Sequence, residues 1–258
     1  MTVNQTISKL VDKIYPPVCV LCGASGQSDH RDETPNQRKK YQAGVDICSA
    51  CESDLIQNPQ ACYQCAIPLP ADVAGDKLRC GACLRAPPAF THTHASYEYC
   101  WPMDKLIQAF KFQGDLAIGR VLSALMQKQI KILAAEAMPT AIISIPLHHS
   151  RLHERGFNQS ALLAADLAKG LETPLLGNFL LREKPSPPQS ELDAKSRKKN
   201  IRGVFSLNPQ ETKLPGHVVL VDDVMTTGST LSEAAGILLA GGVKRVDCWV
   251  IARAPKPG

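Results

Sequence analysis

The chain has 258 residues, of which 44% are hydrophobic and 21% are charged, so it can bury a normal core and lacks the composition of a disordered chain. Its net charge is +5 at pH 7, and its apolar runs are too short to span a bilayer, so we expect no membrane insertion. Residues 1–12 lack the apolar core of a signal peptide, which predicts a cytoplasmic protein.

The N-terminal part of the chain has little hydrophobic periodicity. Residues 7–14 follow the spacing of a short helix, which we expect to pack on its own domain or to dock a partner. Residues 24–44 are polar and predict an exposed excursion. Pro87 and Pro88 then indicate a boundary. We expect one domain over residues 1–88, with a helix and a cysteine-rich module, and a second domain over residues 89–258.

Eight of the ten cysteines form four Cys-x-x-Cys pairs. The pairs are Cys19 with Cys22, Cys48 with Cys51, Cys62 with Cys65, and Cys80 with Cys83. Two such pairs can complete a tetrahedral four-thiolate site, so the eight ligands predict two structural zinc ions. Sequential pairing is the simplest arrangement, and a cross-braced pairing stays open, as does a redox role for one pair. Gly23 and Gly81 lie where the turns of such sites need a permissive backbone.

The second part of the chain alternates short apolar strands with helices. We expect strands over residues 91–99, 141–145, 218–221 and 246–251, and helices over residues 103–112, 115–133, 156–170 and 229–240. This alternation predicts an α/β fold with a parallel sheet flanked by helices. His92 and His94 share one face of the first strand, which we interpret as an exposed strand face and not as a metal site.

Residues 218–230 carry the most informative pattern, V-V-L-V-D-D-V-M-T-T-G-S-T. Asp222 and Asp223 follow a buried strand and can accept hydrogen bonds from ribose hydroxyls, directly or through a divalent ion. The five residues Thr226, Thr227, Gly228, Ser229 and Thr230 precede a helix, whose N-terminus favours a phosphate. An ordinary helix cap needs no acid pair. The segment resembles the 5-phosphoribosyl-1-pyrophosphate (PRPP) motif of type I phosphoribosyltransferases.

Residues 145–159 also lie between a strand and a helix, so we expect them at the same edge of the sheet. Arg151 and Arg155 could clamp pyrophosphate oxygens. We expect His148, His149 and His153 to lie in a loop, where they form hydrogen bonds. Lys111, near the end of a predicted helix, either reaches the phosphates or is a surface lysine.

Together these segments resemble the ComF family of competence-associated proteins over nearly the whole chain. The elements that carry the resemblance are the paired cysteines, F-K-F-Q-G at residues 110–114, P-L-H at 146–148, R-L-H-E-R-G-F-N-Q at 151–159, R-K-K-N-I-R-G-V-F at 197–205, and V-D-D-V-M-T-T-G at 221–228. The resemblance implies a double zinc ribbon in front of a type I phosphoribosyltransferase-like sheet. It implies PRPP binding with Mg²⁺, in which Asp222, Asp223 and Arg155 act catalytically and Leu147, His148, Arg151 and Lys111 contact the ligand.

Residues 182–202 hold seven basic and three acidic residues, a net charge of +4. By resemblance this segment is the mobile lid of type I enzymes, and its alternatives are a solvated surface or a nucleic-acid contact. The basic residues assigned to this role are Arg182, Lys184, Arg197, Lys198, Lys199 and Arg202. Two functions stay open: a phosphoribosyltransferase with an unknown acceptor, and a non-catalytic module that senses a nucleotide or binds single-stranded DNA during natural transformation, with a competence helicase as a partner. The sequence leaves the oligomeric state open.

Overall fold

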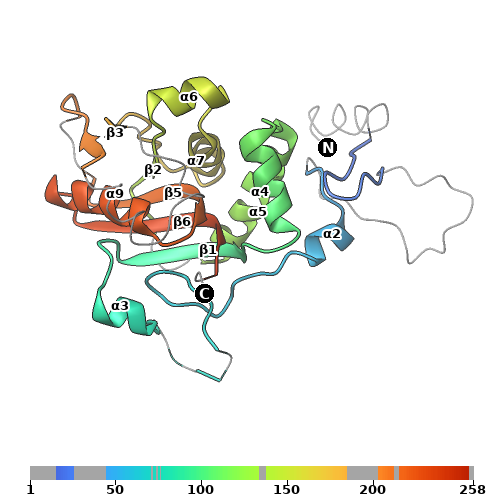
Figure 1. The fold of residues 1–258 in the computed structure, drawn as a ribbon, viewed down its shortest axis with the longest axis horizontal. Coiled ribbons are helices and arrows are strands. Elements are labelled where there is room, and N and C mark those ends of the chain that lie inside the picture. The colour runs from blue at the N-terminus through green and yellow to red at the C-terminus, as the bar shows by residue number, and fades with distance from the viewer. Residues whose placement is uncertain are drawn as a thin grey trace, which may run out of the picture.

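The computed structural model describes residues 16–25, 45–70, 72–73, 75, 77–133, 138–184, 203–211 and 215–255. The helix expected over residues 7–14 and most of the expected excursion lie outside these ranges. At the centre is a four-stranded sheet in the order β1-β6-β5-β2, formed by β1 (His92–Glu98), β6 (Arg245–Arg253), β5 (His217–Met225) and β2 (Ala141–Ser144) (Figure 1). All three pairings are parallel, as the alternation of strands and helices predicts.

Helices cover both faces of the sheet. One face packs against α4 (Met103–Phe112), α5 (Leu116–Leu133) and α7 (Gln159–Gly170), and the other packs against α9 (Ser229–Ala240). Alternate residues of β5 serve the two cores: Val219 and Val221 join the first, and Val218 and Leu220 join the second. Burial on both faces explains the unbroken apolar run of this strand.

Three short elements were not expected. Helix α6 (His149–Arg155) occupies the segment assigned to a loop, and β3 (Leu180–Arg182) pairs antiparallel with β4 (Phe205–Leu207). Gly156 ends α6 in the left-handed conformation, with φ of 79°. The predicted helix over residues 156–170 therefore starts only at Gln159, where the Asn158 side chain accepts hydrogen bonds from the first turn.

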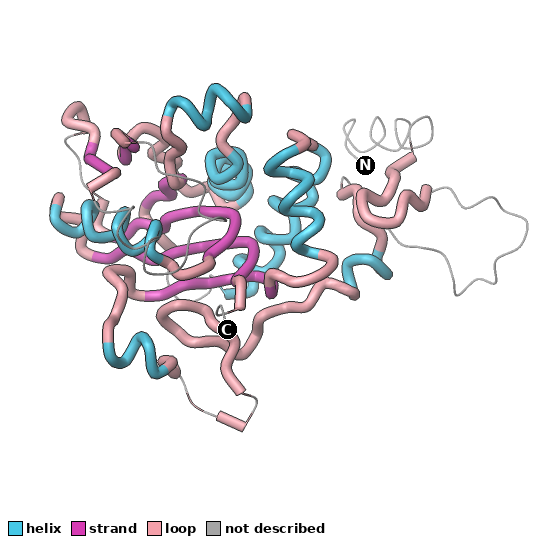
Figure 2. The backbone as a smooth tube through the Cα atoms, in the orientation of Figure 1, coloured by secondary structure: helices cyan, strands magenta, loops and turns pink. Residues whose placement is uncertain are grey.

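The cysteine-rich part forms two small clusters with the short helices α2 (Ser49–Ser53) and α3 (Gly81–Arg85). The segment of residues 56–58, which links the two clusters, lies along the outer edge of β1 (Figure 2). Ile56 accepts a backbone hydrogen bond from Glu98 at 2.9 Å, and Asn58 donates one to Ser96 at 3.3 Å. Ile47 and Leu55 join the core beneath α4 and α5. The division at residue 88 stays a prediction, because the two parts share a core and a strand edge.

No helix among the described residues is both long and apolar enough to cross a membrane.

Candidate functional site

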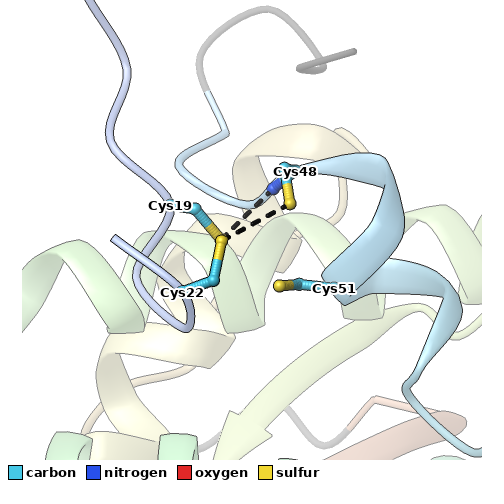
Figure 3. Close-up of side chains that lie close together, drawn as sticks. All are labelled: Cys19, Cys22, Cys48 and Cys51. Atoms are coloured by element: carbon cyan, nitrogen blue, oxygen red, sulfur yellow. Dashed lines mark hydrogen bonds between the residues drawn. The ribbon is translucent and has the colours of Figure 1, made fainter. Parts of the chain in front are cut away.

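The eight paired cysteines form two separate four-sulfur clusters. Cys19, Cys22, Cys48 and Cys51 make one and Cys62, Cys65, Cys80 and Cys83 the other, and within each the ligand atoms lie within 4.8 Å of one another (Figure 3). The pairing is therefore sequential. Each set could hold a zinc ion through four thiolates, which would leave no coordination position for a substrate.

The backbone prepares one thiol of each cluster for a metal. The Cys48 amide donates to Cys19 Sγ at 3.5 Å, and the Cys80 amide donates to Cys62 Sγ at 3.2 Å. Burial raises the pKa of the Cys19 thiol, but hydrogen bonds from backbone amides outweigh it and lower this pKa to about 6. Gly23 has φ of 69°, as expected for a knuckle turn. The expectation for Gly81 was wrong, because this residue opens α3 with an ordinary backbone.

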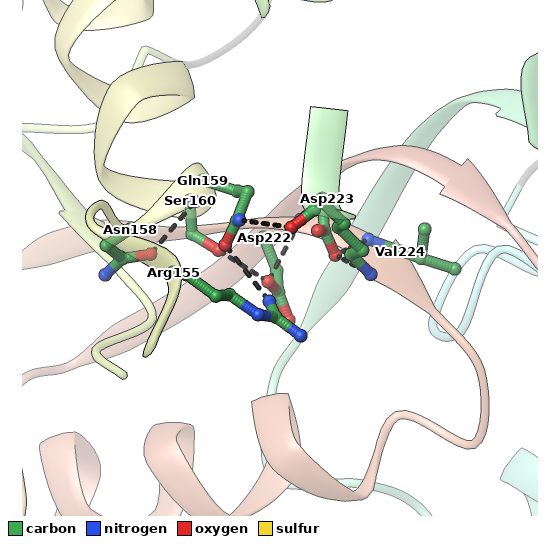
Figure 4. Close-up of polar contacts among 8 residues, drawn as sticks. Arg155, Asn158, Gln159, Ser160, Asp222, Asp223 and Val224 are labelled. Carbon is green, nitrogen blue, oxygen red and sulfur yellow. Dashed lines mark hydrogen bonds and ion pairs between the residues drawn. The ribbon is translucent and has the colours of Figure 1, made fainter. Parts of the chain in front are cut away.

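The acid pair lies near the carboxyl end of β5, which continues past it to Met225. Ser160 Oγ, from the first turn of α7, donates to Asp222 Oδ1 at 2.7 Å (Figure 4). Asp223 is buried, and Lys111 Nζ lies 2.9 Å from its Oδ1. Lys111 is thus an ion-pair partner of the acid pair and not an isolated surface lysine. The sheet edge brings together side chains from α4, α7 and β5.

The two carboxylates have different electrostatic surroundings. Burial and the charge of Asp223 raise the pKa of Asp222 to about 6, against the opposing effects of Ser160 and Lys111. Burial alone would lower the pKa of Lys111, but the attraction of Asp223 outweighs it and raises this pKa. The site therefore combines the Lys111–Asp223 ion pair with a second carboxyl group, Asp222, that keeps its proton to a higher pH than an ordinary aspartate does.

The loop after β5 is the segment in which the sequence predicts a phosphate site. Its residues are Thr226, Thr227, Gly228, Ser229 and Thr230, and all five are partly exposed. Gly228 has φ of 77° and stands at the N-cap of α9, so the loop leads directly into the amino end of a 12-residue helix. The hydroxyls of Thr227 and Ser229 lie 2.9 Å apart. Backbone amides, hydroxyls and the helix end can act together on a dianionic group.

The segment of residues 145–159 meets the same edge, but as a helix. His148 lies in the loop, as expected, and caps α6 by accepting from the Ser150 amide. The loop expected for His149 and His153 was wrong, because both lie in the helix. Arg155 donates to Gln159 Oε1 at 3.2 Å, and its guanidinium lies 5.6 Å from the centre of the Phe112 ring. Gln159 also donates to the Lys111 carbonyl. Arg155 and Lys111 are therefore joined through Gln159.

Other members of the predicted ligand set lie beside this group. Leu147 and Arg151 are partly exposed, and Arg151 Nε is 3.9 Å from Glu154. Arg182 ends β3 with its guanidinium 5.5 Å from the Phe205 ring centre. Burial lowers the pKa of Arg182, and the charges of Asp222 and Arg151 act on it in opposite directions, which places it within electrostatic reach of the acid pair.

The remaining basic residues are only partly described. Lys184 is exposed two residues after β3. Arg197, Lys198, Lys199 and Arg202 lie outside the described residues, so the lid assignment stays a prediction.

His92 and His94 do not form an exposed strand face. They are partly buried and line a cavity of about 450 Å³ between β1 and the second cysteine cluster. Tyr63 stacks on His92 with ring centres 4.5 Å apart, and burial lowers the pKa of His94 to about 4. The expectation was wrong because the cysteine-rich part folds over this strand.

Sequence reasoning missed two residues of the site. Ser160 gave no signal, because a serine in the first helical turn is ordinary. Arg253 ends the otherwise buried strand β6, where a charged residue with 4% exposure requires partners. It donates to the Thr226 carbonyl at 2.5 Å and to the Met225 carbonyl at 3.1 Å, directly behind the loop.

Comparisons with known proteins agree with this arrangement. A family model described as "Phosphoribosyl transferase domain" matches residues 158–257. Competence protein F of Haemophilus influenzae is 36% identical over 81% of this chain and 90% of its own length. The DNA utilization protein YhgH of Escherichia coli K12 is 34% identical over 80% of this chain and 90% of its own length.

More distant matches were also found. Competence protein ComFC of Bacillus subtilis is 26% identical over 89% of this chain and 91% of its own length. Among solved structures, a glutamine PRPP amidotransferase from B. subtilis matches with a TM-score of 0.36 and 18% identity, over 56% of this chain and 30% of that one. The chain has a phosphoribosyltransferase-type domain after two four-cysteine clusters, and Competence protein F matches four fifths of the chain. The chain therefore belongs to the ComF family.

Proposed function

We propose that the protein binds PRPP at the carboxyl edge of its sheet and serves DNA uptake in natural transformation. The first part of the proposal rests on the position of the acid pair next to the loop of residues 226–230. Two carboxylates at a strand end, followed by a loop that leads into a helix N-terminus, suit a phosphorylated sugar. The names of the relatives, competence and DNA utilization proteins, support the second part.

Each part of the ligand has a group to meet. Residues 226–230 would hold the 5-phosphate, and Asp222 and Asp223 would accept hydrogen bonds from the ribose hydroxyls. Leu147, His148 and Arg151 would face the pyrophosphate, and Lys111 and Arg155 add positive charge beside it. The two aspartates are also the oxygen donors that a Mg²⁺ ion accompanying the ligand would find.

The acid pair would further support catalysis, if an acceptor is bound. Departure of pyrophosphate from C1 leaves positive charge on the sugar, and the Asp222 carboxylate would stabilise that charge. Arg155 would act on the departing oxygens. A lid over residues 182–202 would exclude water from the reacting carbon.

Calorimetric titration of PRPP in the presence of Mg²⁺ tests the binding. We expect millimolar or tighter binding by the wild type, and loss of binding in the Asp222→Ala, Asp223→Ala double variant. Asp166→Asn, on the partly exposed side of α7, is a matched control that should bind as the wild type does. Unchanged affinity in the double variant would refute the assignment. Release of pyrophosphate on addition of candidate acceptors would show an enzyme and not a sensor.

A second candidate function is binding of single-stranded DNA without turnover. It is favoured by the net charge of +4 over residues 182–202. Replacing Arg197, Lys198 and Lys199 by Ala should weaken binding of a labelled single strand and flatten its dependence on salt. If affinity responds neither to salt nor to the substitutions, this function is excluded.

A further inference from the structure

Arg253 joins two parts of the molecule that are far apart in sequence. Its Nε donates to the carbonyl of Cys65, a member of the second cysteine cluster, at 2.8 Å and across 188 residues. Its Nη1 donates to the carbonyls of Met225 and Thr226, where the phosphate loop begins, and to that of Ala254. One buried side chain therefore contacts the cluster and the loop together.

The positive charge of Arg253 also connects this residue to the second cysteine cluster. Among the described residues it has no ion pair with a carboxylate, although it is 4% exposed. A divalent zinc ion with four thiolates carries a net charge of −2. The guanidinium beside Cys65 is thus placed to balance that charge, which would otherwise be costly at a buried position.

The contacts to the loop fix the direction of its amides. In a planar trans peptide the carbonyl and the next N–H point in opposite directions. Because the Met225 and Thr226 carbonyls turn toward Arg253, the amides of Thr226 and Thr227 turn away from it. A charged donor on each carbonyl also polarises the peptide and strengthens the opposite N–H as a donor.

We propose that Arg253 is a positioning residue that couples the second cysteine cluster to the phosphate loop. Zinc in this cluster and a sugar phosphate in the loop then bind cooperatively, because both stabilise the same placement of one guanidinium. The proposal rests on the proposed function, since it takes PRPP as the ligand of the loop. Coupling between two sites is reciprocal, so PRPP must also retain the zinc.

The first cysteine cluster provides an internal control. It sits beside α5, where Lys128 contacts Glu52 at 2.6 Å, whereas the cluster that Arg253 contacts, through Cys65, is the second one. Loss of zinc from the first cluster should therefore leave the loop unchanged, whereas loss from the second should disturb it.

The test measures zinc release and PRPP affinity in the full-length, zinc-loaded protein. A chromophoric chelator follows the release of the two ions with and without PRPP and Mg²⁺. We expect PRPP to raise the equilibrium affinity for one ion only, by about five- to a hundredfold, the range of ordinary coupling between sites, so that more chelator is needed to remove that ion. Cys83→Ser should remove the protected ion and weaken PRPP binding, and Cys51→Ser should remove the other ion with no effect on PRPP.

Variants of Arg253 test its role directly. Arg253→Met should weaken PRPP binding about tenfold or more and abolish the protection of zinc, within the same range of coupling. Arg253→Lys, which keeps the charge but not the fork, should retain part of both effects. Arg245→Met, at the opposite end of β6, should match the wild type in both assays.

The outcomes separate this inference from the proposed function. If the wild type binds PRPP but PRPP does not change the chelator concentration at which either zinc ion is lost at equilibrium, the coupling is absent while the binding function stands. If the wild type does not bind PRPP at all, the proposed function fails and the coupling fails with it. The wild-type release assay decides between these results even if a variant does not fold.

Discussion

At the scale of single residues, the acid pair is asymmetric. Asp223 is buried against the Lys111 ammonium, and Asp222 accepts from Ser160 and has a pKa raised to about 6. The fold therefore stabilises the negative charge of Asp222 poorly, and we expect the hydroxyl groups of a bound sugar to donate further hydrogen bonds to it.

This asymmetry predicts a pH-dependent effect of Asp222→Asn on stability. The pKa of Asp222 in the folded protein, about 6, lies above the 3.8 of an unperturbed aspartate. Between these pH values the folded state binds more protons than the unfolded state, so the contribution of Asp222 to stability is lost as pH rises. Asn stays neutral. At pH 8 we expect the variant to be more stable than the wild type by about 1–3 kcal/mol, and therefore to unfold at a higher temperature. Below pH 4 this difference in stability should vanish.

Thermal unfolding of the zinc-loaded protein without added Mg²⁺, at a series of pH values, measures this difference. Asp166→Asn on α7 serves as the control and should show no such trend. A constant offset between Asp222→Asn and the wild type from pH 4 to pH 8 would contradict the assigned pKa.

The ion pair of Lys111 and Asp223 predicts that a substitution of one partner restores the stability lost by substitution of the other. Lys111→Met leaves the Asp223 carboxylate buried without its cation, which we expect to cost about 2–3 kcal/mol of stability. Adding Asp223→Asn removes that charge and should restore most of the loss, which a double-mutant cycle of urea denaturation measures. Lys105→Met, on the exposed side of α4, is the control. Additive effects of the two substitutions would mean that the pair does not interact.

At the scale of elements, the loop between β5 and α9 depends on one backbone conformation. Gly228 has φ of 77°, and a Cβ atom there would lie no closer than 3.6 Å to its neighbours, so the cost of a side chain is in the backbone and not in packing. Gly236 lies in the middle of α9 and would gain a Cβ with only the Ala89 side chain at 4.0 Å. The two glycines of one helix therefore respond in opposite ways.

We expect Gly228→Ala to lose about 1–2 kcal/mol of stability and to weaken PRPP binding, because the left-handed conformation strains an L-residue. Gly236→Ala should gain about 1 kcal/mol with unchanged PRPP affinity, because alanine favours a helix interior. Chemical denaturation and calorimetry measure both. Equal behaviour of the two variants would show that the loop does not need its conformation.

The elements also show what could be predicted from the sequence. The central strands and the helices α4, α5 and α9 were predicted because burial imposes its periodicity on them. Helix α6 was missed because six of its seven residues are polar and its stop signal, Gly156, was assigned to the next helix. The strands β3 and β4 were missed because three residues each show no period, and their pairing spans residues 183–204.

The site was predicted in the same uneven way. Contiguous patterns such as the acid pair and the loop of residues 226–230 can be recognised in the sequence alone. The partners that complete them, Ser160 on α7 and Arg253 on β6, come from other elements, and only the folded sheet brings them near.

At the scale of the whole molecule, the cysteine-rich part and the sheet are interdependent. Ile47 and Leu55 pack in the core under α4 and α5, and Tyr63 accepts a backbone hydrogen bond from Thr93. We still propose two domains that meet near residue 88, but we expect neither to be indifferent to the other.

Removal of zinc should therefore destabilise the entire chain. Four-thiolate sites supply folding energy to small modules, so we expect a strong chelator to lower the unfolding temperature of the whole protein by about 10 °C or more, in one transition. Differential scanning calorimetry with and without added zinc measures this. A chelated protein whose sheet unfolds at the original temperature would show that the two parts are independent.

The segment of residues 56–58 that links the two clusters also protects an edge of the sheet. Its hydrogen bonds with Ser96 and Glu98 occupy the outermost strand, which would otherwise present a free ladder of donors and acceptors. Metal-starved protein should therefore self-associate through β1, so that light scattering rises before helicity falls. We therefore expect zinc in the cysteine clusters to protect the molecule from aggregation as well as to support its structure.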